Sequence, residues 1–172
     1  MDWALRPVTA ADDAFLQRVY ASTRADELAL TDWDAVQREA FLAMQYQAQA
    51  THYRAHWPDA RQSVLTATVS GMQHDVGRLW LHLRPDAIHV LDIALLADYR
   101  NLGIGSACLL NLMAKAGASD RAVTVSVETA NPARRWYDRL GFAPVGELQG
   151  AHQRMAWQRL ATEHKEICDE QA

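Results

Sequence analysis

The sequence contains few cysteines, no long hydrophobic run and no surplus of basic residues, and each absence excludes a class of protein. The two cysteines among its 172 residues, Cys108 and Cys168, stand 60 positions apart. This spacing suits neither a disulfide framework nor a paired set of metal ligands, so the reducing cytoplasm is the expected location. No apolar run approaches the roughly 18 residues that a membrane span needs. The N-terminal residues lack the cationic start and apolar stretch of a secretory signal.

Net charge and composition favour one soluble globular domain. The net charge of −4 argues against a dedicated nucleic-acid binder, which usually carries a basic surplus. Apolar residues make up 49% of the chain and charged residues 22%, and the length suits a single core. We therefore predict one domain over residues 1–160, followed by a polar tail over residues 161–172.

The hydrophobic pattern changes along the chain from helical spacing to alternation and then to a mixture of the two. Helical spacing with capping residues at the ends predicts helices over 11–23, 31–56, 103–117 and 132–140. Strand-like runs bounded by turn residues fall at 4–8, 64–68, 76–83, 87–96, 123–127, 142–148 and 153–160. The run over 87–96 is mostly apolar, which predicts a central strand covered on both faces. Strand–helix alternation in the second half predicts α/β layering.

Two glycines, Gly103 and Gly105, stand where the predicted central strand leads into the next helix. The first amides of a helix have no internal partner and carry the positive end of the helix dipole, so such an end can bind an anion. Without a Cβ atom, the glycines let a phosphate approach the main chain, and Arg100 and Ser106 add donor groups. A pyrophosphate could be held here almost entirely by main chain. A plain tight turn is the alternative interpretation.

A second segment has the ends of a well-capped helix. Asn131 is a good N-cap, and Gly141 fits the position after the helix. Tyr137 lies on the apolar face of this helix, which is typical of a core residue. The alternative is that Asn131 grips a ligand where the preceding strand ends, with Arg134 and Arg135 facing outward near the same end.

Together the two segments resemble the motifs of the GNAT superfamily of N-acetyltransferases, over about residues 4–160. The acetyl-CoA motif of that family, Arg/Gln-x-x-Gly-x-Gly/Ala, stands here at residues 100–105. Its second motif, an Asn and an Ala ahead of a Tyr and a Gly-Phe pair, stands here as Asn131, Ala133, Tyr137 and Gly141–Phe142. The resemblance implies an α+β layered GNAT fold. This is a central mixed, mostly antiparallel sheet of about seven strands, splayed between the fourth and the fifth, with about four flanking helices.

The resemblance also implies an acyltransferase that moves an acetyl group from acetyl-CoA to the primary amine of a small molecule, by direct attack in a ternary complex. A protein or peptide N-acetyltransferase and a non-catalytic acyl-CoA-binding module are the alternatives. Tyr137 would act as general acid for the leaving thiolate. His89, Asp92, Glu128 or water would take the proton of the amine. The residues expected to contact the coenzyme are Ile93, Ala94, Leu95, Arg100, Asn101, Leu102, Gly103, Ile104, Gly105, Ser106, Asn131, Arg134 and Tyr137.

The first two helices and their connecting loop usually shape the acceptor site in this family. Residues 1–60 hold 5 basic and 9 acidic side chains, whereas residues 61–162 hold 11 basic and 8 acidic ones. The positive surplus thus falls in the part that would bind the anionic coenzyme, and the negative surplus weakly favours a cationic amine. A homodimer is compatible with the family. The acceptor candidates are Tyr20, Arg24, Glu27, Trp33, Gln45 and Tyr53.

Three further residues with metal-binding or nucleophilic chemistry are interpreted without such a role. His52 and His56 have the i, i+4 spacing that can bind zinc, but no third ligand is evident. We interpret them as surface or acceptor-pocket residues and predict no metal site. Cys108 falls inside a predicted helix, where a buried inert thiol is expected.

Overall fold

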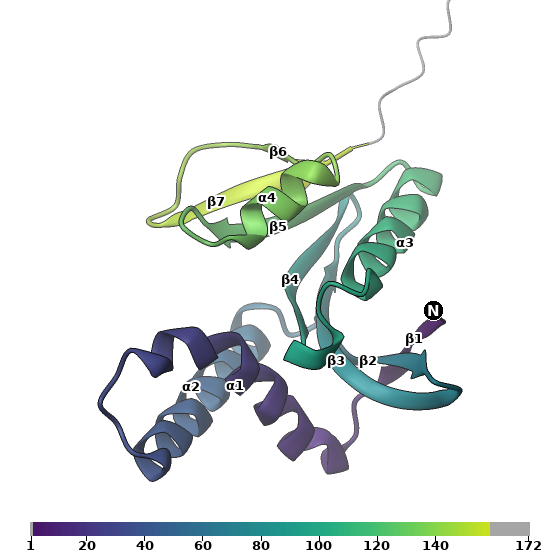
Figure 1. Ribbon diagram of the computed structural model, residues 1–172. Helices are drawn as coiled ribbons and strands as arrows, with labels where there is room; N and C mark the ends of the chain where they lie inside the picture. The colour runs from purple at the N-terminus through teal and green to yellow at the C-terminus, as the bar shows by residue number, and fades with distance from the viewer. Residues whose placement is uncertain (1, 159–172) are drawn as a thin grey trace, which may run out of the picture.

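The residues that the computed structural model describes, 2–158, form one seven-stranded sheet (Figure 1). The strands are β1 (Trp3–Pro7), β2 (Arg61–Val69), β3 (Met72–Leu83), β4 (Ala87–Leu95), β5 (Ala122–Glu128), β6 (Ala143–Pro144) and β7 (His152–Trp157). Their order in the sheet is β1-β2-β3-β4-β5-β7-β6, and every neighbouring pair is antiparallel except β4 and β5. The mixed, mostly antiparallel sheet with β4 at its centre confirms the expected fold class.

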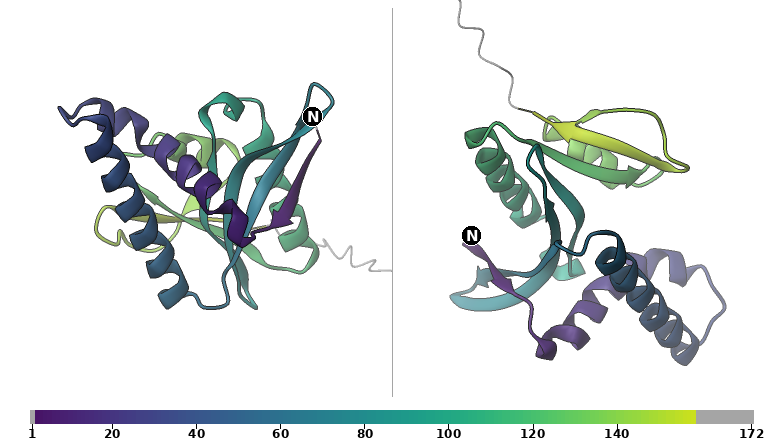
Figure 2. Two further views of the ribbon diagram at one scale, coloured as in Figure 1. Left: turned by 90° about the horizontal axis from the view of Figure 1, so that it is seen from below. Right: turned by 180° about the vertical axis from the view of Figure 1, so that it is seen from behind.

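Four α-helices in this part of the chain cover the two faces of the sheet (Figure 1, Figure 2). They are α1 (Asp13–Ala29), α2 (Ala35–His56), α3 (Ile104–Ala118) and α4 (Ala133–Arg139), with short 3₁₀ turns η1 (Ala10–Asp12) and η2 (Ala97–Tyr99). α1 and α2 pack on one face, and α3 and α4 on the other. None of these helices combines the length and hydropathy that a membrane-crossing segment requires.

Each face of the sheet has its own core. On the α3 and α4 face, Leu109 and Leu112 of α3 pack in one apolar cluster with Val123 and Met155 of the sheet. The core on the other face is smaller and includes tyrosines. Its buried members are Phe15, Leu16, Val19, Tyr20, Tyr46, Val64 and Ala94.

The ends of α2 are set by local residues. The carboxylate of Asp34 accepts a hydrogen bond from the Gln37 amide (2.8 Å), and the Gln37 side chain accepts one from the Asp34 amide (3.0 Å). This reciprocal arrangement satisfies two amides that the first helical turn would leave unpaired. The predicted end at His56 is confirmed, because Pro58 follows and cannot continue the helix. The helix begins at Ala35 rather than at residue 31.

α1 is longer than predicted. It continues to Ala29, well beyond the predicted end at Thr23. Its last turns carry one buried apolar residue, Leu28, so the hydrophobic pattern there was too sparse to indicate a helix. Good helix formers and an ion pair between Arg24 and Glu27 (2.9 Å) support these turns instead.

The last two strands are shorter than predicted. The run over 142–148 forms only the two-residue β6, because Pro144 has no amide to donate and Gly146 adopts a left-handed φ of 68°. β7 ends at Trp157. The predicted continuation over 159–160 lies outside the described residues.

β4 and β5 pair over four positions only and then diverge (Figure 1). Ala87–Val90 align with Ala122–Val125. After these positions β4 continues along β3 to Leu95, and β5 continues along β7 to Glu128. The expected splay between the fourth and fifth strands is thus confirmed.

A β-bulge marks the point of divergence. Leu91 has no partner on β3 because the register shifts by one residue there. A bulge bends its strand and increases the local twist, which turns β4 away from β5. We call the space between residues 91–95 of β4 and 126–128 of β5 the wedge. On its β4 side the main chain meets no neighbouring strand.

Candidate active site

The glycine turn before α3 presents its main chain to open space. Gly103 adopts a left-handed φ of 81°, and Asn101 adopts a φ of 60°. A Cβ atom built on Gly103 would have no neighbour within 4 Å. α3 begins at the next residue, so the unpaired amides of its first turn lie beside this space. The turn therefore has room for an anion at the positive end of a 15-residue helix.

Gly105 serves a packing contact. A Cβ atom on Gly105 would lie 3.3 Å from the ring of Trp136. The indole Nε1 of Trp136 donates a hydrogen bond to Oγ of Ser106 (2.9 Å). α4 thus docks on the first turn of α3 through Trp136, and the missing side chain of Gly105 makes room for the indole ring.

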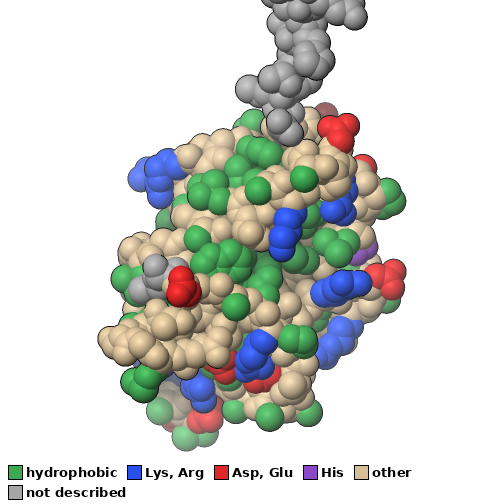
Figure 3. Space-filling view, turned by 90° about the vertical axis from the view of Figure 1, so that its right-hand side faces the viewer, with side chains coloured by type: hydrophobic (Ala, Val, Ile, Leu, Met, Phe, Trp, Pro, Cys, Tyr) green, Lys and Arg blue, Asp and Glu red, His purple; other side chains and the backbone are tan. Residues whose placement is uncertain are grey.

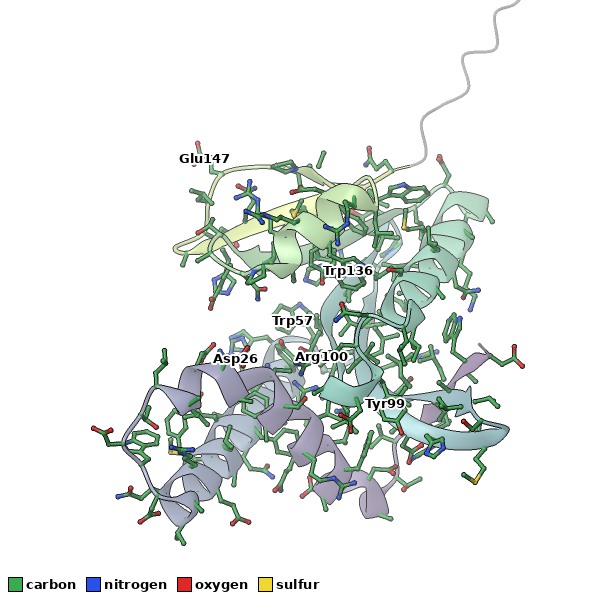
Figure 4. The ribbon with its side chains drawn as sticks, in the orientation of Figure 1. Asp26, Trp57, Tyr99, Arg100, Trp136 and Glu147 are labelled. Carbon is green, nitrogen blue, oxygen red and sulfur yellow. The ribbon has the colours of Figure 1, made fainter. Side chains whose placement is uncertain are left out.

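Arg100 directs its guanidinium group toward α1 and β4. Nε donates a hydrogen bond to the Leu95 carbonyl (2.9 Å). Nη2 donates to the carbonyl of Ser22 (2.7 Å) and to its hydroxyl (2.9 Å). Figure 4 shows Arg100 on the α1 side of the wedge and Trp136 on the α4 side. The side chain therefore joins α1, the end of β4 and the glycine turn.

α4 begins at Ala133 with Pro132 as its N-cap, and the side chain of Asn131, the predicted cap, still pairs with the first helical amide. Its side-chain oxygen accepts a hydrogen bond from the Ala133 amide (2.9 Å). Beside it lies a cavity of about 530 Å³, lined by the β5–α4 connection and by α4. The cavity is lined by Thr129, Ala130, Asn131, Pro132, Arg134, Arg135 and Asp138. Both arginines predicted to face outward near Asn131 therefore border one concave surface.

Tyr137 of α4 is buried, yet its hydroxyl makes no hydrogen bond to any residue within 2–158. Burial raises the pKa of Tyr137, and the carboxylate of Asp92 on β4 raises that pKa further. The hydroxyl therefore keeps its proton at neutral pH and has no hydrogen-bond partner among the described residues.

Asp92 belongs to a buried polar network with Arg78 and Gln49. Its Oδ2 accepts a hydrogen bond from Nε of Arg78 (2.7 Å), and Nη2 of Arg78 donates to Oε1 of Gln49 (2.7 Å). The Arg78 side chain is 1% exposed and that of Asp92 is 19% exposed. An ion pair this far from water persists only when its remaining donors and acceptors are also satisfied. Gln49 supplies one such partner.

Sequence reasoning missed Arg78 and Gln49. The signal for Arg78 was its place inside a strand with apolar neighbours, where a charge has to be paired if it is buried. Gln49 gave no comparable signal, because α2 carries several glutamines. The prediction placed Gln45 at the acceptor site, and Gln49, one turn later, is the glutamine that reaches the network.

The other two base candidates lie apart from this network. Nδ1 of His89 lies 2.8 Å from Oγ1 of Thr124, so His89 bridges β4 and β5 just before they diverge. Burial, together with the charge of Arg154, lowers the pKa of His89 to about 4. Glu128 stands at the far end of β5, where its carboxylate lies 3.7 Å from Nε2 of His152 and about half of it is exposed.

Two of the acceptor candidates reach the centre of the molecule. The hydroxyl of Tyr53 donates a hydrogen bond to the carbonyl of Leu91, the bulged residue (3.1 Å). Burial and the carboxylate of Asp92 raise the pKa of Tyr53. The guanidinium of Arg78 lies 5.4 Å from the ring centre of Tyr20. Tyr53 and Tyr20 therefore flank the polar network.

Trp57 adds an aromatic wall at the end of α2. Its ring centre lies 5.8 Å from that of Tyr53 and 6.3 Å from that of His89. Figure 4 shows it between the α2 and α4 sides of the molecule.

The remaining acceptor candidates lie at different distances from this centre. Trp33 lies just before the start of α2 and packs edge-on against Phe41 of that helix, with 5.0 Å between ring centres. Tyr53 lies about 27 Å along the helix axis from Ala35, the first residue of α2, at about 1.5 Å per residue. Arg24 pairs with the exposed Glu27 (2.9 Å), and its guanidinium lies 5.9 Å from the ring centre of Tyr20. Gln45 is partly buried on α2.

Cys108 is buried in the core, and His52 and His56 lie against each other on α2. Burial raises the pKa of the Cys108 thiol to about 12, which confirms the buried, inert thiol that the sequence predicts. The rings of His52 and His56 lie 4.0 Å apart between centres. Within residues 2–158, no three His, Cys, Asp or Glu side chains are grouped so that they could hold a metal ion.

The fold and the two motifs match one known family. The sequence profile of the Acetyltransferase (GNAT) family matches residues 17–142. The chain belongs to the GNAT family. It is therefore an acyltransferase by family, and the wedge and glycine turn stand where the family motifs predicted them. No curated protein sequence matches the chain.

Solved structures similar to this GNAT protein cover most of its length. The PaiA N-acetyltransferase of Thermoplasma acidophilum, in complex with coenzyme A, has a TM-score of 0.65 and 16% identity over 92% of this chain and 100% of its own. An acetyltransferase of Thermus thermophilus has a TM-score of 0.63 and 20% identity, over 92% and 98%. A GCN5-related N-acetyltransferase of Rhodopseudomonas palustris has a TM-score of 0.59 and 22% identity, over 92% and 97%. At these identities the likeness shows the shared fold.

Proposed function

We propose that the protein transfers the acetyl group of acetyl-CoA to the primary amine of a small molecule, by direct attack in a ternary complex. The observation that carries this proposal is the wedge itself. Beyond Val90 the main chain of β4 has no partner on the β5 side, an open glycine turn follows the end of the strand, and the buried hydroxyl of Tyr137 has no hydrogen-bond partner within residues 2–158. An extended amide-bearing arm, an anionic head group and a leaving thiolate need these three features.

The coenzyme would be bound mainly by main chain. The pantetheine arm would pair with Ile93, Ala94 and Leu95 as an added strand, because these residues have no partner on the β5 side. The pyrophosphate would meet the amides of residues 101–106, where Gly103 leaves the space open. Figure 3 shows the α3 side of the molecule, where Lys and Arg side chains are spread among Asp and Glu side chains, so the main chain rather than a basic surface would hold the anion. Asn131 and Arg134 border the cavity beyond.

The chemistry needs no covalent enzyme intermediate. The amine nitrogen forms a bond to the thioester carbon, and an amide near Leu95 stabilises the oxyanion. The carbon–sulfur bond then breaks, and Tyr137 protonates the thiolate. Donor and acceptor would enter from opposite faces of the sheet, because α4 carries Tyr137 on one face and α1 and α2 lie on the other.

Glu128 is the base that we propose, acting on the amine through water. The carboxylate of Asp92 is bound to Arg78, and the lowered pKa of His89 makes that imidazole a weak base. Glu128 faces solvent at the open end of the wedge. It also shares a face of β5 with Thr124, which contacts His89, so it lies on the acceptor side.

A small acceptor is supported by the way α2 closes over β4. The hydroxyl of Tyr53 is bound to the main chain of Leu91, and Trp57 lies near His89, so the end of α2 covers the acceptor side of the wedge. An extended peptide would need this surface open. The acidic surplus of residues 1–60 supports a cationic amine.

Calorimetric titration with CoA and acetyl-CoA tests the coenzyme site. We expect micromolar-to-submillimolar binding that Gly103→Glu abolishes, because a carboxylate would then occupy the pyrophosphate space. Gly71→Glu is the matched control. Gly71 has the same φ of 81° and the same open surroundings, but lies in the β2–β3 turn. Absence of binding, or equal behaviour of the two variants, would contradict the proposal.

A panel of small amines and peptides, with thiol release as the readout, tests the acceptor class. Turnover with small cationic amines and none with peptides is the expected result. Turnover with peptides only would make the protein a peptide N-acetyltransferase. Coenzyme binding without any transfer would make it an acyl-CoA-binding module.

A further inference from the structure

Arg100 occupies the position of the acetyl-CoA motif that is expected to help bind the pyrophosphate, yet Nε and Nη2 of its guanidinium already donate hydrogen bonds within the protein. A guanidinium has five N–H groups, and it grips a phosphate best through an edge that uses two nitrogens at once. Both edges of Arg100 that could do this include Nη2. The Nη2 atom donates to the carbonyl and to the hydroxyl of Ser22, and Nε donates to the Leu95 carbonyl. Neither edge is free.

Turning Arg100 toward a phosphate would also leave buried acceptors without partners. The Leu95 carbonyl would keep only a long contact with the Ser22 hydroxyl (3.5 Å). That hydroxyl already donates to the carbonyl of Val19 (2.9 Å), which orients its oxygen to accept from Arg100. Leaving a buried backbone oxygen without a partner carries a desolvation cost, which offsets much of what a new bond to a solvated phosphate would contribute.

We propose that Arg100 is a positioning residue that clamps α1 to the end of β4 and transmits coenzyme binding to the acceptor side. The inference rests on the proposed function. Ser22 lies on α1 between Tyr20 and Arg24, two acceptor candidates, and Leu95 ends the segment that would pair with the pantetheine arm. Arg100 itself stands three residues before Gly103 in the turn. An anion that orders the turn would therefore hold α1 in place, and by linkage an ordered α1 would favour coenzyme binding.

A comparison of CoA binding with pantetheine binding distinguishes the two possible roles of Arg100, a clamp between α1 and β4 or a residue that binds the pyrophosphate. CoA carries the pyrophosphate, whereas pantetheine has the same arm without it. If Arg100 bound the pyrophosphate, Arg100→Met would weaken CoA about tenfold or more, as loss of a charge-assisted hydrogen bond does, and leave pantetheine unchanged. For a clamp we expect both ligands to weaken by a similar factor, so that the ratio of their dissociation constants stays within about twofold of wild type.

Hydrogen–deuterium exchange of α1 supplies a second readout. We expect CoA to slow exchange over residues 20–28 in the wild type and not in Arg100→Met. Without ligand, Arg100→Met is expected to exchange faster there. Arg121→Met is the matched control. It removes the same charge from an arginine whose side-chain bond to Ser119 is solvent-exposed, and it should match the wild type in both readouts.

The outcomes are distinguishable. If Arg100→Met weakens the binding of CoA but not that of pantetheine, and leaves the exchange of α1 unchanged, the clamp is overturned and Arg100 binds the pyrophosphate. If Arg100→Met does not fold, Ser22→Ala decides. It should lose part of the CoA-induced protection of α1 at an unchanged ratio of ligand affinities, and full protection would overturn the inference. Failure of the wild type to bind CoA would instead contradict the proposed function, and the ligand-free exchange of α1 would still test the clamp.

Discussion

The two faces of the sheet bury different chemistry. Under α3 and α4 the core is apolar, and Cys108, Leu109 and Met155 have no exposed surface. Under α1 and α2 the protein buries Arg78 with Asp92, among tyrosine rings. The apolar face supports a site made of main-chain groups, whereas the polar face holds side chains whose charge and orientation depend on one another.

Under the proposed function, the apolar face would support the coenzyme site and the polar face would border the acceptor. A site made of main-chain groups, such as the glycine turn before α3, needs only a rigid helix and a turn of the right shape. The apolar core under α3 and α4 holds both in place. Burial raises the pKa of Tyr53 and that of Tyr137, and the carboxylate of Asp92 raises both further. The following predictions test the contrast from its largest expected effect to its smallest.

Arg78→Met should destabilise the protein most, lowering the free energy of unfolding by roughly 3 kcal/mol, because the partly buried carboxylate of Asp92 would lose its counter-ion. Urea unfolding followed by circular dichroism measures this. The double variant Arg78→Met/Asp92→Asn should recover part of the loss. A loss below about 1 kcal/mol, the size expected for an exposed pair, would mean that the two faces do not differ as described.

Tyr137→Phe should lower kcat about 100-fold, within the usual range for a lost general acid. Since the hydroxyl has no hydrogen bond within residues 2–158, the dissociation constant of CoA and the unfolding free energy should barely change. Steady-state kinetics, calorimetry and urea unfolding supply the three measurements. A large stability loss together with unchanged kcat would assign Tyr137 to the apolar core alone.

His89→Gln should make stability less dependent on pH between about 4 and 6.5. Histidine in an unfolded chain titrates near pH 6.5, whereas burial lowers the pKa of His89 in the folded protein to about 4. In this window the unfolded state binds more protons, so wild-type stability falls as the pH is lowered. Thermal midpoints from pH 4 to 8 measure the effect. Parallel curves for the two proteins would contradict the buried, neutral state of His89.

The smallest expected effect is the labelling of the Cys108 thiol in the native protein. In a Cys168→Ser background, this thiol should react with a disulfide reagent at pH 8 only as fast as the protein unfolds, because burial raises the pKa of Cys108 to about 12. Labelling with and without urea measures this. Rapid labelling of the native protein would show that the α3 face is not dry.

The coenzyme side was the more predictable of the two from the sequence. The side chain of Asn131 pairs with the first helical amide of α4 and Gly103 takes the left-handed turn before α3, because both properties depend on a few neighbouring residues. The last turns of α1 and the short β6 were mispredicted where propensity and a proline outweighed the apolar pattern. On the acceptor side, Arg78 meets Asp92 and Gln49 from separate strands and a helix, and no local spacing encodes such a meeting.

The sequence alone determined the element order, the glycine turn, the capped helix with Tyr137 and hence the family, since these rest on short-range rules of main-chain geometry. Tertiary structure alone decided which donors are already bound. Arg100 has the position of a phosphate ligand in the motif, and its bonds to Ser22 and Leu95 exist only once α1 is packed on β4. A side chain as long as arginine can reach several partners, and folding selects among them by which buried acceptors would otherwise lack a donor.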